Sequence, residues 1–226
     1  MKYKYQLHTH TAPCSKCGRT TPAELIEAMR EGGYQGCVLT NHFYGGNTGI
    51  SREISWEEFV GAYEKDYLDC KREAEKYDLD VIFGVEQSIG GGREILCYGI
   101  TPKMLYDNPD LVKRDIELWS KTLHGYGALV IQAHPFRKRE YITDPGTYPL
   151  EYIDGIEVYN RGNLPEANEE AEAFALENPG LIFTSGADTH TIDSVCSGGI
   201  ETDVRIRNAS DLISLLRSGC YELIKN

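Results

Sequence analysis

Residues 3–11 read Tyr-Lys-Tyr-Gln-Leu-His-Thr-His-Thr, a strand-like segment that runs into two closely spaced histidines. We expect residues 3–9 to form a β-strand. His8 and His10 are two positions apart, so on a strand both imidazoles project from the same face. The alternative, a core strand with two satisfied histidines, requires a buried hydrogen-bond partner for each ring, because an unpartnered buried polar group is costly. The spacing therefore favours a metal chelate.

Six further metal-binding side chains occupy similar positions, at or just beyond the ends of predicted strands. They are His42, Glu86, His134, Glu157, Asp188 and His190. Imidazole and carboxylate together hold borderline divalent metals at neutral pH. Considered singly, histidines such as His42 and His134 are more often structural than ligands, and Asp188 with His190 could be a solvated loop pair. Their repeated position predicts a multinuclear metal site and hence a hydrolase, with only His124 outside the pattern.

The composition is that of an ordinary globular protein, and 226 residues fit one domain over residues 1–226. A net charge of −12 argues against a general nucleic-acid binder, although bound dications would make the site locally positive. Seven cysteines without a pairing pattern are typical of reduced thiols in a cytoplasmic protein. No apolar run approaches the ~20 residues of a membrane span, and no signal region precedes residue 8, so we expect a cytoplasmic protein without a membrane partner.

Short apolar strands alternate with amphipathic helices along the chain. The predicted strands are residues 3–9, 37–40, 81–86, 95–100, 128–132, 155–159 and 181–185. The predicted helices are residues 22–32, 56–77, 109–126, 163–177 and 209–218. The first helix has Thr21 as N-cap, Pro22 in its first turn and Glu24 to complete a capping box, and Ser210 is a candidate cap for the last helix.

Strands separated by helices favour parallel pairing, and polar residues at their ends are typical of barrel active sites. The chain is short for eight strand–helix units, so we expect a seven-stranded or distorted α/β barrel. The alternative is an open doubly wound sheet. No dinucleotide-binding glycine pattern follows the first strand, which weakens that alternative.

The chain resembles PHP-domain proteins, the family named for polymerase and histidinol phosphatase. The resemblance rests on six motifs that occur in the family's order and span nearly the whole chain. They are residues 8–11, 40–42, 84–86, 133–135, 156–160 and 186–190. The resemblance implies a distorted (β/α)7 barrel of the PHP type that binds two or three divalent ions of zinc, manganese or iron.

The resemblance also implies a set of ligands. The expected ligands of the first metal are His8, His10, Glu86 and Asp188. Glu86 is expected to bridge to a second metal shared with His134, while His42 and His190 hold a third. Glu157 is expected to orient a metal ligand by a hydrogen bond without contacting the metal itself. The alternative is a buried carboxylate that only hydrogen-bonds within the barrel.

This sequence departs from the family at three positions. Asn41 stands where many relatives have aspartate, and we expect it to lie behind the ligands. Glu94 is the expected carboxylate substitute for a histidine that relatives supply after the bridging glutamate. The remaining ligand of the third metal is expected to be the Cys17 thiolate, with Ser15 a weaker candidate; alternatively, Cys14 and Cys17 are simply reduced loop thiols.

The resemblance implies a metal-dependent phosphoesterase. A hydroxide bridging two metals is expected to attack phosphorus in line, with Asp188 and His190 as catalytic residues and His190 or a metal-bound water protonating the leaving group. Arg137 is the expected phosphate clamp, unless it belongs to a solvated basic loop. Arg161 and Arg19 are weaker candidates for substrate binding.

The expected substrate is a small-molecule phosphate monoester, because the chain has no obvious large insertion for gripping a polymer. One alternative is a phosphodiesterase or nuclease. Another is a metal-binding structural or regulatory domain that has lost catalysis.

Overall fold

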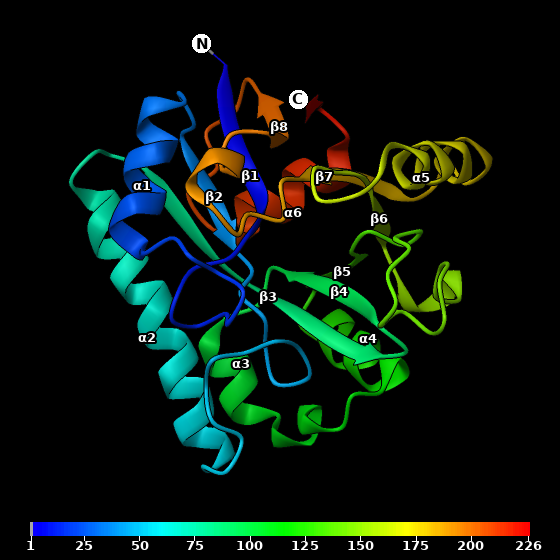
Figure 1. Cartoon of the computed structure of the whole chain (residues 1–226), viewed down its shortest axis with the longest axis horizontal. Coiled ribbons are helices and arrows are strands. Elements are labelled where there is room, and N and C mark those ends of the chain that lie inside the picture. Colours follow the sequence, from blue (N-terminus) through cyan, green and yellow to red (C-terminus); the bar gives the residue numbers. More distant parts are fainter. Residues whose placement is uncertain (1) are drawn as a thin grey trace.

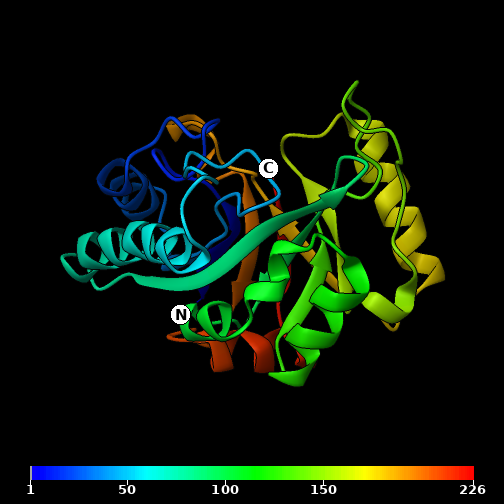
Figure 2. The same cartoon turned by 90° about the horizontal axis from the view of Figure 1, so that it is seen from below.

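A single curved sheet organises the protein (Figures 1 and 2), which we describe over residues 2–226 from a computed structural model. Its nine strands lie in the order β7-β6-β5-β4-β3-β2-β1-β8-β9. The strands are β1 (Tyr3–Thr9), β2 (Gly36–Leu39), β3 (Asp80–Gly90), β4 (Arg93–Tyr98), β5 (Leu129–Gln132), β6 (Gly155–Asn160), β7 (Ile182–Gly186), β8 (Gly198–Thr202) and β9 (Glu222–Lys225).

The sheet curls until β7 comes close to β1, so that it is nearly closed. Thr9 and Thr189 form an isolated parallel bridge, and the His10 N–H donates to the Thr189 carbonyl at 3.2 Å. This mixed α/β architecture confirms the expected distorted barrel. The closure also brings the end of the first strand against the residues that follow the seventh, which places two histidine motifs side by side.

The expectation that strands separated by helices pair in parallel was wrong for β4 and β5. Strands β1–β2–β3 and β5–β6–β7 are parallel, but β4 is antiparallel to both of its neighbours. The reason is local: Gly90, Gly91 and Gly92 all have positive φ and connect β3 to β4 as a tight hairpin that leaves no room for a crossover helix. Strands β8 and β9, which we did not predict, also pair antiparallel.

Six α-helices pack around the sheet in the part of the chain described. They are α1 (Pro22–Glu31), α2 (Trp56–Glu75), α3 (Pro102–Asp107), α4 (Ile116–Gly125), α5 (Pro165–Glu177) and α6 (Ala209–Ser218). Three short 3₁₀ turns are η1 (Pro109–Val112), η2 (Leu150–Tyr152) and η3 (Ile192–Ser194). Five helices match predicted ones, whereas α3 was not anticipated because six residues are too few to show an apolar period. No helix within residues 2–226 has the length and apolar content to cross a membrane.

The helix starts follow the expected capping chemistry with one exception. Thr21 and Glu24 form the predicted capping box at α1. At α6 the N-cap is Asn208, whose side chain accepts from the Asp211 N–H, so the prediction of Ser210 as cap was wrong. Both residues are good caps, and Asn208 lies where the backbone is still extended.

Replacing Thr21 by alanine tests the first cap. We expect Thr21→Ala to lower the free energy of unfolding by about 1 kcal/mol, because one helix N–H loses its acceptor. Thermal unfolding should therefore begin about 2 to 4 °C lower. Thr191→Ala is the matched control, since Thr191 begins η3 without a side-chain cap bond. Equal shifts for the two variants would contradict the capping role.

An aromatic cluster supports the loop that carries the histidine motif at residue 42. Phe43 packs edge-on against Phe59, Tyr63 and Trp119, with ring centroids 5.0 to 6.0 Å apart. The Tyr63 hydroxyl donates to the Asn41 carbonyl at 2.7 Å. The core thus anchors the segment between β2 and the glycine-rich loop, which includes the histidine motif at residue 42.

Candidate metal centre

Eight of the predicted metal-binding side chains converge at one end of the barrel. They are His8, His10, His42, Glu86, Glu94, His134, Asp188 and His190. The parallel strands deliver their carboxyl ends to this edge, as in other barrels. Strand β4 runs the other way, so its beginning, with Glu94, reaches the same place.

Glu86 lies at the middle of the cluster. His8 Nε2 is 3.1 Å from Glu86 Oε1, and His42 Nδ1 is 2.6 Å from Glu86 Oε2. His10 Nε2 lies 3.4 Å from Glu86 Oε2 and 3.1 Å from Asp188 Oδ1. The carboxylate of Glu86 therefore faces three imidazoles at once, as a bridging ligand between neighbouring ions would.

Glu94 and His134 form the part of the cluster nearest to β4. Glu94 Oε2 is 3.5 Å from His134 Nε2, and Glu94 Oε1 is 3.8 Å from His42 Nδ1. His134 Nε2 is also 3.3 Å from Glu86 Oε1. Glu94 thus lies within 4 Å of both imidazoles and beside the Glu86 carboxylate.

Neighbouring acceptors determine which nitrogen of each ring is free. His8 Nδ1 lies 3.0 Å from Glu157 Oε1, so this nitrogen carries the proton and donates it. His10 Nδ1 lies 3.3 Å from Ser15 Oγ, whose own proton goes to Asn41 Oδ1 at 2.8 Å. Both rings therefore present an unprotonated Nε2 to the cluster, the form that binds metal.

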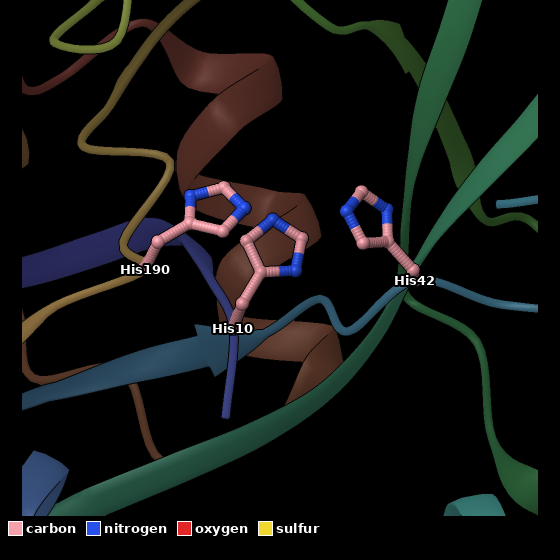
Figure 3. A group of neighbouring side chains, drawn as sticks. All are labelled: His10, His42 and His190. Carbon is pink, nitrogen blue, oxygen red and sulfur yellow. The ribbon is translucent and has the colours of Figure 1, made fainter. Parts of the chain in front are cut away.

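His10, His42 and His190 form a second group of facing imidazoles (Figure 3). The ring of His10 lies 4.4 Å from that of His42 and 4.8 Å from that of His190, centroid to centroid. His190 Nδ1 is 2.6 Å from the Asp188 carbonyl oxygen, which can only accept, so Nε2 is again the free nitrogen.

These residues fit divalent metal ions. Within residues 2–226, the buried atoms His8 Nε2, His42 Nδ1 and Glu86 Oε2 have no partner in hydrogen-bond geometry. Unpaired buried polar atoms are costly and rare, and here three of them lie close together in one cluster. The sets whose donor atoms lie within 4.8 Å of one another are His8–His10–Asp188, His8–Glu86–His134, His42–Glu86–Glu94 and His10–His42–His190.

Burial and close charges shift the acidities of the carboxylates in opposite directions. Burial, reinforced by the charge of Glu86, raises the pKa of Glu94 to about 8. Burial also opposes ionisation of Asp188, but the Arg137 guanidinium outweighs it and holds the pKa of Asp188 well below its usual range. A site whose acidities diverge in this way is typical of a functional centre.

Two of the cluster's residues have backbone conformations that L-amino acids seldom adopt. His134 has φ of 30° and Asp188 has φ of 52°. Left-handed backbone at residues other than glycine persists where the surrounding structure compensates for it, and it concentrates at functional sites. Each lies two residues after the end of its strand, β5 or β7, and the turn places its side chain in the cluster.

A second layer of polar residues fixes the ligands. Glu157 accepts from the His8 ring and from the His134 backbone N–H at 3.1 Å, so it orients one ring and holds the backbone of the other ligand without joining the donor sets. Asn41 Nδ2 donates to Asp66 Oδ2 at 2.8 Å. Sequence reasoning missed Asp66, although an aspartate in the apolar stripe of α2, between Tyr63 and Cys70, was a signal that could have found it.

Arg137 is buried rather than part of a solvated loop. Its Nη2 lies 2.6 Å from Asp188 Oδ2 and 2.7 Å from Asn160 Oδ1, and its Nε donates to Asn163 at 2.8 Å. Arg161 was expected to help bind substrate, and the structure does not bring it to the site. Its backbone N–H bonds to Gly186 while its exposed side chain lines a separate hollow beside α5.

A cavity of about 400 Å³ opens over the cluster. His42, Glu94, Arg137, Asp188 and His190 line it, together with Cys17, Tyr141 and the glycine-rich loop residues 45–47. Burial opposes ionisation of Cys17, but hydrogen bonds from His190 and His42 outweigh it and lower the pKa of this thiol to about 6. Arg19, the other weak candidate, is exposed and does not line the cavity.

Comparisons with known proteins identify the fold. No protein-family model and no curated protein sequence matches the chain. A two-domain protein from Bacteroides vulgatus containing a predicted PHP-like metal-dependent phosphoesterase superimposes with a TM-score of 0.72 at 16% identity, covering 100% of this chain and 65% of that one. The chain has the PHP-type fold.

Other proteins with similar structures carry different names. A protein from Bifidobacterium adolescentis named for metal-dependent phosphoesterase activity matches with a TM-score of 0.57 at 16% identity, over 95% of this chain and 96% of that one. A lesion-specific endonuclease from Pyrococcus furiosus matches with a TM-score of 0.62 at 12% identity, over 99% of this chain and 58% of that one. Because similar structures are named for different activities, the function of this protein must be inferred from its site and not from its fold.

Glu94→Gln tests the departure from the PHP pattern at β4. Glutamine keeps the size of the side chain but removes the charge that a dication requires. We expect affinity for the metal beside His134 to fall about 10- to 100-fold, with the ion nearest His8 less affected. Metal content by elemental analysis after dialysis measures both. The exposed Glu117→Gln variant is the control, and unchanged metal content and hydrolysis rate would remove Glu94 from the ligand set.

Proposed function

We propose that this protein is a metal-dependent phosphoesterase that hydrolyses a small-molecule phosphate monoester. The observation that best supports this proposal is the cluster of imidazoles and carboxylates at the floor of an open cavity. Its donor atoms form four overlapping sets and include buried atoms without a hydrogen-bond partner. Such a set holds two or more dications close together, the arrangement that stabilises in-line phosphoryl transfer.

We infer how the ligands divide among the ions. We assign His8, His10, Glu86 and Asp188 to the first ion and His134 with Glu94 to the second, with Glu86 as the bridge; this agrees with the distances between their donor atoms. His42 and His190 belong to a third. The mixed nitrogen and oxygen donors suit zinc, manganese or iron(II).

The protein's own groups position the substrate around these ions. When bound, divalent ions neutralise charge on the phosphoryl oxygens and activate water at neutral pH. Arg137 contributes positive charge to the cavity wall while orienting Asp188. His190 has one free nitrogen, which can bind a metal or carry a proton but not both, and we assign it to the metal.

Two observations favour a small monoester over a nucleic acid. The cavity volume of about 400 Å³ suits a small molecule, and the net charge of −12 repels a polyanion. A phosphodiesterase acting on nucleic acid is the second candidate. Lys138 and Arg139 line a hollow that adjoins the cavity at Arg137, where a phosphate backbone could lie.

Metal analysis and a substrate panel test the proposal. Protein loaded separately with zinc, manganese and iron(II) is assayed with p-nitrophenyl phosphate, sugar phosphates, bis(p-nitrophenyl) phosphate and duplex DNA with an abasic site. We expect at least two ions per chain and faster hydrolysis of a monoester than of either diester. Preference for DNA would select the second candidate. Bound metal without hydrolysis of any ester would indicate a structural or regulatory metal domain instead.

A further inference from the structure

The third metal position lacks a donor if only histidines are counted. His10, His42 and His190 lie together, but His10 donates Nδ1–H to Ser15 and directs its one free nitrogen at Asp188 and Glu86. One nitrogen lone pair cannot serve two ions. Two imidazoles therefore remain for the third ion, whereas nitrogen- and sulfur-ligated sites normally have three or four protein donors.

Ser15 cannot fill the gap, because its hydroxyl is already committed. Its Oγ donates to Asn41 Oδ1 at 2.8 Å and accepts from the His42 backbone N–H at 3.0 Å. Both contacts lie within the buried layer behind His10. Ser15 thus acts as a support for the imidazoles and not as a ligand.

Cys17 is held beside the two remaining imidazoles. It lines the cavity together with His42 and His190. Backbone bonds on both sides fix its loop: the Arg19 N–H donates to the His190 carbonyl at 2.9 Å, and the Lys16 N–H donates to the Asn47 carbonyl at 2.9 Å. The loop is thereby tied to the same two segments that carry the imidazoles.

His42 can offer its other ring nitrogen to a third ion. The residue is only 7% exposed, its Nδ1 lies 2.6 Å from Glu86 Oε2, and the remaining ring nitrogen faces His10 and His190 (Figure 3). The other cysteines do not line this cavity: Cys14, for example, is packed in the core, and Cys220 is exposed far along the chain.

We propose that the Cys17 thiolate, with His42 and His190, holds the third divalent ion and makes that position selective for a thiophilic metal. This inference rests on the proposed metal-dependent function and extends it. The metal binds the deprotonated sulfur, so any proton still on the thiol passes to solvent. A soft sulfur donor favours zinc or cobalt(II) over manganese or magnesium, so the third position differs in metal preference from the oxygen-rich first and second.

Cobalt(II) substitution reports the sulfur ligand directly. Wild-type protein titrated with cobalt(II) should develop a near-ultraviolet thiolate-to-cobalt charge-transfer band. Cys17→Ser should lose that band and bind about one ion fewer per chain, while retaining the visible bands of cobalt held by nitrogen and oxygen. Cys220→Ser, the exposed control, should keep the band. Circular dichroism and thermal unfolding of each variant show whether the fold is retained.

Alkylation of the wild-type protein gives a second test that needs no substitution. Peptide mapping after iodoacetamide treatment should show Cys17 modified in the presence of EDTA and protected at least tenfold by zinc, with Cys220 modified equally in both. Equal rates for Cys17, or an unchanged cobalt band in Cys17→Ser, would overturn the inference. Hydrolysis with two ions and no thiolate band refutes only the Cys17 ligand, whereas a thiolate band without hydrolysis supports it and refutes the phosphoesterase.

Discussion

Asp188→Asn is expected to lower the rate of phosphate ester hydrolysis roughly 10³-fold while the protein stays folded. Asp188 Oδ1 faces His10 and His8, and its other oxygen binds Arg137. Asparagine keeps the shape but removes the charge that offsets a dication, and several kcal/mol of transition-state stabilisation depend on that ion. Steady-state kinetics and metal content, measured on the same preparations, check both parts.

The matched control is Asp193→Asn, which removes an exposed carboxylate from the same segment. It should retain full activity and metal content. If Asp188→Asn hydrolysed esters at the wild-type rate with its metals in place, Asp188 would be neither a ligand nor a catalytic residue.

Arg137→Ala is expected to destabilise the metal-free protein by about 3 to 5 kcal/mol, because it leaves the buried Asp188 carboxylate without its cation. In the presence of zinc or manganese the loss should be smaller, since a bound dication takes over that charge. We also expect kcat/KM to fall about 10- to 100-fold, as for other residues that orient ligands. Chemical denaturation with and without EDTA measures the difference.

Arg161→Ala is the control, because Arg161 is a nearby arginine that lies outside the cavity. It should change the free energy of unfolding by less than about 0.5 kcal/mol. Arg137→Lys separates charge from geometry, because lysine keeps the charge but cannot contact Asp188 and Asn160 in the same plane. A destabilisation by Arg137→Ala that is identical with and without metal would show that the ion pair is not coupled to the metal centre.

Much of the site was visible in the sequence because strand ends leave a local signature. A short apolar run followed within a few residues by a histidine or carboxylate occurs at His42, His134 and Asp188, and barrel geometry brings such ends together. The capping box at Thr21 was equally local. These features depend on residues within a few positions of one another, so composition and spacing suffice to find them.

The residues that were missed or misplaced depend on contacts between distant segments. Asp66 lies on a helix and reaches Asn41 across 25 positions, and Arg137 reaches Asp188 across 51. Arg161 and Arg137 are chemically alike, and only the direction in which each loop leaves its strand separates them. No spacing rule in the sequence encodes that direction.

By itself the sequence determined the donor chemistry, the strand ends that carry it and the α/β barrel class, because these follow from side-chain type and local period. Only the tertiary structure shows which donor atoms lie within reach of one another. The antiparallel turn at residues 90–92 brings Glu94 to the cluster, and near-closure of the sheet sets β1 against β7. Hydrogen bonds from Glu157 and Ser15 then select the free nitrogen of His8 and His10, and such choices exist only once segments far apart in the chain are in contact.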